Sequence, residues 1–177
     1  MFTTTSNWNY SQLSSTDVAV FNKEILTAHD ISFPYDSVRN GEWTFDMLIS
    51  HTKDMYLDLN GDGSRDLGDQ YGFVTNPEQT SILTSCDAHV LGKTADGSLE
   101  FTVMTYKMVD LVEKHYSWYY ETNDVFLSSY RTEDDDFTAK VFANGKSAYG
   151  YTNLSFVNMY LRDSDVIYGI VPLPKYA

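Results

Sequence analysis

The sequence has one cysteine, few basic residues and no long hydrophobic run. Cys86 stands alone among 177 residues, which excludes an internal disulfide and a cysteine-rich zinc site. No run approaches the roughly 18 apolar residues of a membrane span, and the first residues lack the basic and apolar stretches of a signal peptide. Only 12 Lys and Arg oppose 25 Asp and Glu, a net charge of -13, so nucleic acid and anionic membranes would repel the chain.

Motifs for catalysis are also missing. The sequence has no Gly-x-Ser-x-Gly, no Walker loop and no Gly-x-Gly-x-x-Gly, and its four histidines lack the His-Glu-x-x-His spacing of zinc hydrolases. Two of them, His51 and His115, are expected at the surface or the boundary of predicted helices, and Cys86 in the core. Carboxylates are so common in this sequence that a pair of them is no evidence for the acid and base of a glycosidase. We therefore predict a protein that is not an enzyme.

Hydrophobic residues make up 42% of the chain and aromatic residues 15%, which is enough for one folded domain. Short β-branched and aromatic runs predict strands at 17–21, 71–74, 147–151 and 168–171. Helical periodicity and capping residues predict helices at 22–28, 44–56, 104–116, 137–144 and 155–161, with another starting at 76–78. Loops are predicted at 30–42 and 117–136, a hairpin at 89–101 and an irregular arm at 1–13. Strands alternating with helices predict an α/β fold over 14–177, a single three-layer lobe with a mostly parallel sheet.

An acidic loop at 58–69 has the spacing of an EF-hand calcium loop. Oxygen-bearing side chains stand at positions 1, 3, 5, 9 and 12, Gly63 stands at position 6, where the loop turns sharply, and position 7 offers a backbone carbonyl. Position 12 is Asp instead of the usual Glu, and a strand follows instead of a second helix. The pattern predicts a structural calcium site that joins helix 44–56 to strand 71–74; the alternative is a solvated acidic turn without metal. The candidate metal ligands are Asp58, Asn60, Asp62, Ser64, Asp66 and Asp69.

Polar side chains follow two of the predicted strands. Open α/β sheets bind ligands at the carboxyl ends of their strands, so these side chains are candidate ligand-binding residues. Tyrosine and tryptophan supply an apolar face with a polar edge, the chemistry that suits carbohydrate. For Trp118 the alternative is a place in the core or at its rim. The candidates are Asn76, Glu78, Gln79, Trp118, Tyr151, Thr152 and Asn153.

Five segments, in the same order along the chain, resemble segments of bacterial extracellular solute-binding proteins of sugar ABC transporters. They are Val-Ala-Val-Phe-Asn-Lys-Glu-Ile-Leu (18–26), Gly-Glu-Trp-Thr-Phe-Asp (41–46), Asn-Gly-Asp-Gly (60–63) followed by Asp-Gln-Tyr-Gly-Phe (69–73), Phe-Ala-Asn-Gly-Lys-Ser-Ala (142–148), and Tyr-Gly-Ile-Val-Pro-Leu-Pro (168–174). Together they span nearly the whole chain.

This resemblance implies the second lobe of a two-lobed protein with the type II periplasmic-binding-protein fold. The first lobe, a lipoprotein signal and the C-terminal helices would lie outside this chain. Such proteins act outside the cell, close on a mono- or oligosaccharide between their lobes and deliver it to permease subunits of the transporter. By position, the loops after strands 71–74 and 147–151 would face the ligand cleft, and Phe156 is the nearest candidate for an aromatic that stacks on a sugar ring.

Two other functions remain open. The sequence Asp-Leu-Asn-Gly-Asp-Gly at 58–63 resembles one calcium repeat of a dockerin, a calcium-dependent protein-interaction module. Dockerins need a second such loop close by, and this sequence has none. A fragment of a glycoside hydrolase is the third possibility, and turnover of a chromogenic glycoside would distinguish it.

Overall fold

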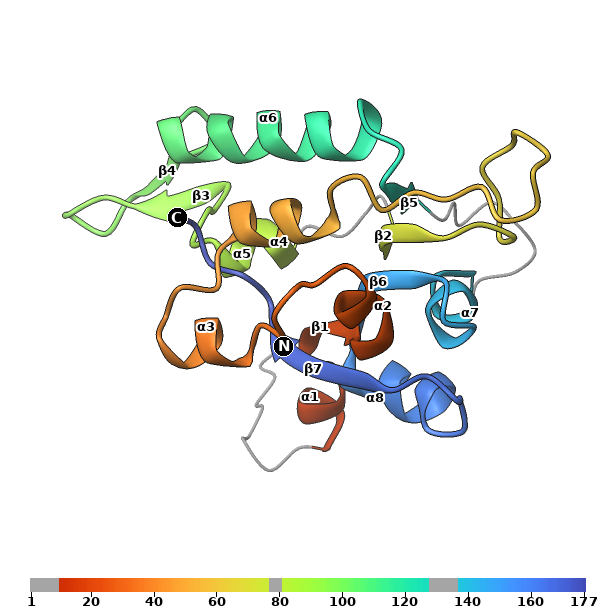
Figure 1. Ribbon diagram of the computed structural model, residues 1–177. Coiled ribbons are helices and arrows are strands. Elements are labelled where there is room, and N and C mark those ends of the chain that lie inside the picture. Colours follow the sequence, from red (N-terminus) through yellow and green to blue (C-terminus); the bar gives the residue numbers. More distant parts are fainter. Residues whose placement is uncertain (1–9, 77–80, 128–136) are drawn as a thin grey trace.

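The computed structural model describes residues 10–76, 81–127 and 137–177 (Figure 1). Its helices are α1 (Tyr10–Ser14), α2 (Lys23–Ala28), α3 (Tyr35–Arg39), α4 (Phe45–Thr52), α5 (Ser81–Ser85), α6 (Tyr106–Tyr120), α7 (Phe137–Ala143) and α8 (Leu154–Phe156), which continues into the π-helical turn η1 (Val157–Leu161). Its strands are β1 (Asp17–Asn22), β2 (Tyr71–Thr75), β3 (Leu91–Lys93), β4 (Leu99–Phe101), β5 (Val125–Leu127), β6 (Ser147–Asn153) and β7 (Tyr168–Pro172).

A five-stranded sheet with the order β5-β2-β6-β1-β7 forms the centre of the fold. Strand β2 runs parallel to β5 and β6, whereas β1 runs antiparallel to β6 and β7. The predicted α/β class is confirmed, and the sheet is mixed because β1 enters it in the opposite direction. Consequently β5, β2, β6 and β7 all have their carboxyl ends at one edge, where β1 begins.

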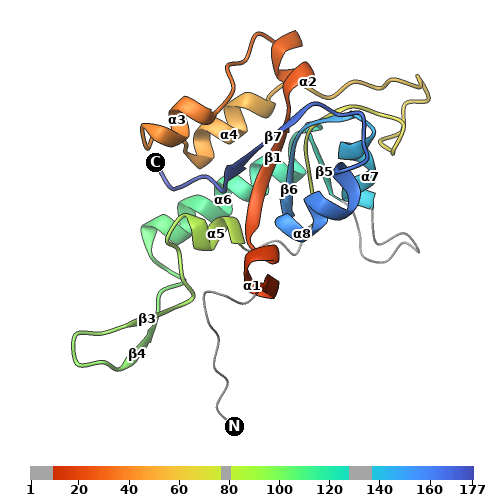
Figure 2. The ribbon, with the colours of Figure 1, turned by 90° about the horizontal axis from the view of Figure 1, so that it is seen from below.

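Helices cover both faces of the sheet (Figure 2). Ala19 and Phe21 of β1 belong to one buried cluster, which includes residues of α4, α5 and α6. Val18 and Val20 belong to a second cluster with residues of α7 and η1. Because side chains alternate across a strand, the two clusters lie on opposite faces of the sheet. The result is the three-layer lobe that the alternating pattern predicts.

Helix α4 begins as predicted but ends earlier. The hydroxyl of Thr44 accepts a hydrogen bond from the Met47 N–H at 3.2 Å, so Thr44 is its N-cap. The chain leaves the helix after Thr52 instead of continuing to residue 56. The cause is the buried Asp124, whose carboxylate accepts the backbone N–H groups of residues 54–56 at 2.9–3.1 Å. A distant carboxylate therefore ends the helix that the local pattern would continue.

Three predicted loops contain helices. Helix α3 lies within the predicted loop 30–42, α1 occupies the end of the predicted arm 1–13, and α6 continues through residues 117–120. Residues 1–9 lie outside the described part of the chain. Helix α5 begins at Ser81, and residues 77–80, where the predicted helix start continues, also lie outside the described part.

Other boundaries agree with the sequence. Strands β3 and β4 form the predicted hairpin, and Gly145 ends α7 with a φ of 72°, in the left-handed region that favours glycine. No helix in the described residues combines the length and apolar character needed to cross a membrane.

Candidate functional site

The candidate ligand residues gather at the carboxyl edge of the sheet. Strands β2 and β6 are parallel, with Val74 level with Gly150, so Asn76 and the last residues of β6 lie at the same edge. The Asn76 side-chain oxygen accepts a hydrogen bond from the Thr138 hydroxyl of α7 at 2.9 Å. This bond joins the end of β2 to a helix on one face of the sheet.

The last residues of β6 divide between the two faces. Tyr151 is buried in the cluster that includes Tyr119 of α6. Thr152 is half-buried and, with Phe156 and Thr138, lines a narrow apolar pocket between the sheet and α7. Asn153 is the N-cap of α8, because its side-chain oxygen accepts the Phe156 N–H at 3.0 Å. The three residues therefore have different surroundings although they are consecutive.

Aromatic surface at this edge comes from Phe156. Its ring is half-buried and lies 4.4 Å from the ring of Tyr160, measured between centroids. Glu78 and Gln79, also candidates, lie outside the described residues. Phe156 is thus a candidate stacking residue with part of its surface accessible.

Trp118 does not lie at this edge. It is 3% exposed, its indole N–H donates to the Thr52 hydroxyl at 3.1 Å, and its ring packs 4.6 Å from that of Phe73. The structure therefore corrects its assignment to ligand binding: Trp118 belongs to the core, the alternative that the sequence left open. The reason is that α6 extends to Tyr120 and carries Trp118 onto its buried face.

Two tyrosine hydroxyls at this edge are buried without a hydrogen-bond partner among the described residues, those of Tyr119 and Tyr151. Burial raises the pKa of both phenols above the usual value, and the nearby Asp17 carboxyl raises that of Tyr151 further. Both groups therefore remain protonated donors at neutral pH. Sequence reasoning singled out Tyr151, near the end of a predicted strand, whereas the burial of Tyr119 depends on the length and phase of α6.

The acidic loop is closed by hydrogen bonds from its own backbone to its carboxylates. The Asp58 carboxylate accepts the N–H groups of Gly61 and Gly63 at 2.6 and 3.0 Å, and the Asp62 carboxylate accepts that of Ser64 at 2.7 Å. Gly63 has a φ of 73°, the conformation expected at the sharp turn. Asp58 and Asp62 are exposed.

The candidate ligands of this loop are engaged with protein groups. Asp69 is fully buried and accepts the Leu59 N–H and the Tyr56 hydroxyl, both at 3.2 Å. The Asn60 side-chain nitrogen lies 3.0 Å from the Asp62 carboxylate and 3.5 Å from that of Asp66. No three His, Cys, Asp or Glu side chains within the described ranges are arranged to hold a metal. The loop thus has the residue spacing of an EF-hand loop, while its candidate ligands are hydrogen-bonded to other protein groups.

Two cations hold the acidic loop at the opposite edge of the sheet. Arg65 donates to the backbone carbonyls of Asn123 and Val125, next to and within β5. Lys146, just before β6, donates to the carbonyls of Leu67 and Gly68 at 3.1 and 2.8 Å. Because strands β2 and β6 begin here, the loop is separated from the candidate ligand residues by the length of the sheet.

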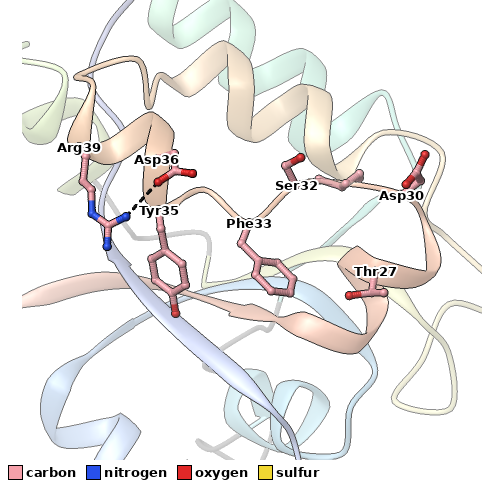
Figure 3. Close-up of a pocket in the computed structure, with 8 residues that line it drawn as sticks. Thr27, Asp30, Ser32, Phe33, Tyr35, Asp36 and Arg39 are labelled. Atoms are coloured by element: carbon pink, nitrogen blue, oxygen red, sulfur yellow. Dashed lines mark hydrogen bonds and ion pairs between the residues drawn. The ribbon is translucent and has the colours of Figure 1, made fainter.

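A larger open pocket, of about 490 Å³, lies beside α2 and α3 (Figure 3). Phe33 and Tyr35 contribute aromatic surface, and Asp36 pairs with Arg39 at 2.9 Å. This pocket adjoins the carboxyl end of β1, which is antiparallel to β6. It therefore lies at the edge opposite Asn76 and Tyr151 and is distinct from the candidate ligand site.

Two histidines and the cysteine pack in the core or at its border. His51 is half-buried and its Nδ1 lies 2.8 Å from the Tyr149 hydroxyl, while the His115 ring stacks 4.4 Å from that of Phe45. Burial lowers the pKa of both histidines. Cys86 is 1% exposed, and burial raises its pKa to about 11, as expected for a core thiol.

No family model and no curated protein matches this chain. Solved structures do. An ABC substrate-binding protein from Listeria monocytogenes in complex with cycloalternan has a TM-score of 0.62 at 14% identity; the match covers 90% of this chain and 38% of that protein. The maltose/maltodextrin-binding domain MalE from Bdellovibrio bacteriovorus bound to maltotriose has a TM-score of 0.59 at 19% identity, over 90% of this chain and 37% of that one.

An ABC transporter solute-binding protein from Agrobacterium radiobacter K84 in complex with ribitol is also similar, with a TM-score of 0.58 at 16% identity, over 89% of this chain and 37% of that one. The chain therefore has the fold of part of these sugar-transporter solute-binding proteins and spans less than two fifths of their length. At these identities the likeness is one of fold.

Proposed function

We propose that the chain is the second lobe of an extracellular solute-binding protein of a sugar ABC transporter, and that the carboxyl edge of its sheet is half of a carbohydrate site. One observation carries the proposal: parallel strands bring Asn76 and the end of β6 to one edge, in a fold whose matches include proteins bound to cycloalternan and maltotriose.

The chemistry of the edge suits a neutral sugar. Amide and hydroxyl groups of Asn76, Thr152 and Asn153 are of the kind that hydrogen-bond sugar hydroxyls, and the ring of Phe156 offers a face for the sugar ring. The protein is proposed to bind and deliver the sugar without transforming it. Its partners would be the first lobe, which closes over the ligand, and the permease subunits, with a lipoprotein anchor holding the full-length protein at the cell surface.

A lobe that supplies half of the contacts binds weakly, because the other half of the desolvated surface is missing. The test is an NMR titration of the isotope-labelled chain with millimolar maltotriose and a panel of other saccharides. Shifts concentrated on Asn76 and residues 151–156, and reduced in Phe156→Ala, are the expected result. The exposed Asn158→Ala variant is the control.

Two outcomes would contradict the proposal. Shifts confined to the pocket beside α2 and α3 would move the sugar site to the other edge. No shift with any saccharide, repeated on a two-lobed protein that contains this chain, would show that the solute is not a carbohydrate.

We also propose that the acidic loop binds a structural calcium ion. The EF-hand spacing, the φ of Gly63 and the exposure of Asp58 and Asp62 support it. The side-chain oxygens of Asp58, Asn60, Asp62, Asp66 and Asp69 and the carbonyl of Ser64 would hold the ion. Calcium there would neutralise clustered carboxylates and fix the connection between α4 and β2.

A further inference from the structure

The open pocket beside α2 and α3 has an aromatic floor between two polar ends. Its volume of about 490 Å³ lies within the range of small-ligand sites. In the view of Figure 3, Asp36 and Arg39 lie at one end, Thr27 and Asp30 lie at the other, and two aromatic rings lie between them. The pocket is at the edge of the sheet opposite the candidate ligand residues, so the proposed sugar site does not account for it.

One wall of the pocket is a fixed turn at the end of α2. Asp30 has a φ of 56°, and its N–H donates to the Thr27 carbonyl at 3.1 Å. The next N–H, that of Ile31, donates to the Leu26 carbonyl at 2.9 Å, and the Ile31 side chain packs against the core. These bonds satisfy carbonyls at the helix end. The exposed Asp30 carboxylate is therefore presented to the pocket by a turn that a ligand would not have to order.

The floor consists of Phe33 and Tyr35, which pack on Phe21 of β1. Their ring centroids lie 5.7 and 5.3 Å from that of Phe21, which is fully buried. Gly169 of β7 makes room for this packing, because a Cβ there would collide with the Phe21 ring and the Tyr35 hydroxyl. Phe33 nevertheless remains 38% exposed. The floor is thus held by the core and offers an accessible aromatic face on which an apolar ligand face can stack.

The charged groups around the two rings balance one another. The Lys23 ammonium lies 5.9 and 5.8 Å from the two ring centroids, and Arg39 pairs with Asp36 at 2.9 Å. Asp30 supplies a second carboxylate. A cationic ligand would meet two basic groups and an anionic ligand would meet two acidic ones. A neutral ligand with several hydroxyl groups has neither disadvantage, because each hydroxyl can accept from a cation or donate to a carboxylate.

We propose that this pocket is a second carbohydrate site, in which a neutral sugar ring stacks on Phe33 and its hydroxyls bond to the polar groups at the two ends. Thr27 adds an acceptor, because its hydroxyl donates to the Lys23 carbonyl at 2.7 Å and keeps its lone pairs for a ligand. The inference goes beyond the proposed function, since every residue of the pocket belongs to this lobe and none to the carboxyl edge. The pocket therefore needs no first lobe to bind its sugar.

Asp30→Asn tests the site without disturbing the turn, because asparagine also tolerates a positive φ. In an NMR titration of the isotope-labelled chain with millimolar maltotriose, we expect shifts at residues 27–39 in addition to those of the carboxyl edge. A hydrogen bond to a carboxylate is roughly twice as strong as one to a neutral group, so Asp30→Asn should weaken the binding reported by residues 27–39 about fivefold. Asp163→Asn, at another exposed acid, is the matched control and should leave this affinity unchanged.

Two ring variants separate the two sites. Phe33→Ala should weaken binding at residues 27–39 about fivefold and leave the shifts of the carboxyl edge unchanged, whereas Phe156→Ala should do the reverse. Phe33→Tyr keeps the aromatic face and should retain the affinity, which distinguishes lost stacking from a disturbed fold.

Charged sugars test the neutrality of the ligand. Glucosamine and glucuronate carry one charge on a ring like that of glucose, so both should bind the pocket more weakly than glucose. Tighter binding of either one would overturn the assignment of a neutral sugar.

Failure of this inference and failure of the proposed function are distinguishable. Shifts confined to Asn76 and residues 151–156, or equal affinities of Asp30→Asn and Asp163→Asn at residues 27–39, would overturn the inference and leave the proposed function intact. Shifts confined to residues 27–39 would support the inference and contradict the proposed function. No shift at either place would overturn the inference, because all of the pocket lies in this chain, whereas the carboxyl edge supplies only half of its proposed site and is tested again in the two-lobed protein.

Discussion

The carboxylate of Asp124 allows a direct test of how the chain that leaves α4 is joined to the start of β5. It is 7% exposed and joins the start of β5 to the chain that leaves α4. One oxygen accepts the N–H groups of Met55 and Tyr56 at 2.9 and 3.1 Å, and the other accepts that of Asp54 at 3.0 Å. Asp124→Ala removes two acceptor oxygens and three hydrogen bonds at once, and it leaves three backbone donors in a partly or fully buried turn.

The magnitude follows from those three donors. Leaving a buried donor unsatisfied costs about 1–3 kcal/mol, and only the Met55 N–H is fully buried, so the total loss should be about 3 kcal/mol. For a chain of this size that loss lowers the melting temperature by about 9 °C. Asp124→Asn keeps the oxygen that accepts two bonds and turns its amide nitrogen towards Asp54, so its loss should be about 1 kcal/mol.

Urea unfolding followed by circular dichroism measures both values, with the exposed Asp163→Ala as the control. The free energy of unfolding should be highest for the control, lower for Asp124→Asn and lowest for Asp124→Ala. Equal losses for the two Asp124 variants, or a loss below about 1 kcal/mol for alanine, would refute the assignment of all three bonds to this carboxylate.

Three further predictions concern acid, packing and calcium. Burial lowers the pKa of His51 and His115 in the folded protein, so the unfolded chain binds more protons at pH values near and below about 6.5. The free energy of unfolding should therefore fall as the pH drops through that value and level off below the lowered pKa values. Urea midpoints measured between about pH 7.5 and 5 should change less with pH in the double variant His51→Gln/His115→Gln than in the control His29→Gln. Gly72→Ala places a methyl group against the backbone carbonyl of Thr52, so overpacking should lower the free energy of unfolding by about 1–3 kcal/mol. In the same urea assay the control Gly97→Ala, which has open space but a φ of 87°, gives the cost of an unfavourable backbone conformation without a steric clash. Calcium should raise the melting temperature relative to EGTA, and Asp62→Asn should reduce that difference; an identical melting temperature under both conditions would contradict a structural calcium site.

The sequence predicts the central strands well because each is a short, apolar run. Residues of β1, β2 and β6 are almost entirely buried, so their hydrophobic character is visible without knowledge of their partners. The direction of a strand within the sheet is not visible in this way. Alternation of strands and helices favours parallel pairing, and nothing within 17–22 signals that β1 lies antiparallel between two strands from the far end of the chain.

Side-chain roles are harder to read than elements. Trp118 and Tyr119 are buried, whereas Tyr116 and Tyr120, in the same aromatic run, are 59% and 61% exposed. Residue type therefore does not distinguish the buried positions of this run from the exposed ones. Only the helical phase of α6 assigns the first two to the interior, and the length of that helix was underestimated. Likewise α3 has no buried residue to mark it, and α4 ends because of a carboxylate about seventy positions away.

The position of β1 has a consequence for how the sheet assembles. This strand is complete within the first 22 residues, yet its neighbours in the sheet are β6 and β7, which end at residues 153 and 172. Its hydrophobic side chains can therefore be covered on both sides only after residues 147–172 are available for pairing. Strands β5, β2 and β6 form one end of the sheet and can pair without β1, and we expect the pairing of β1 to be the slower step because it closes long loops.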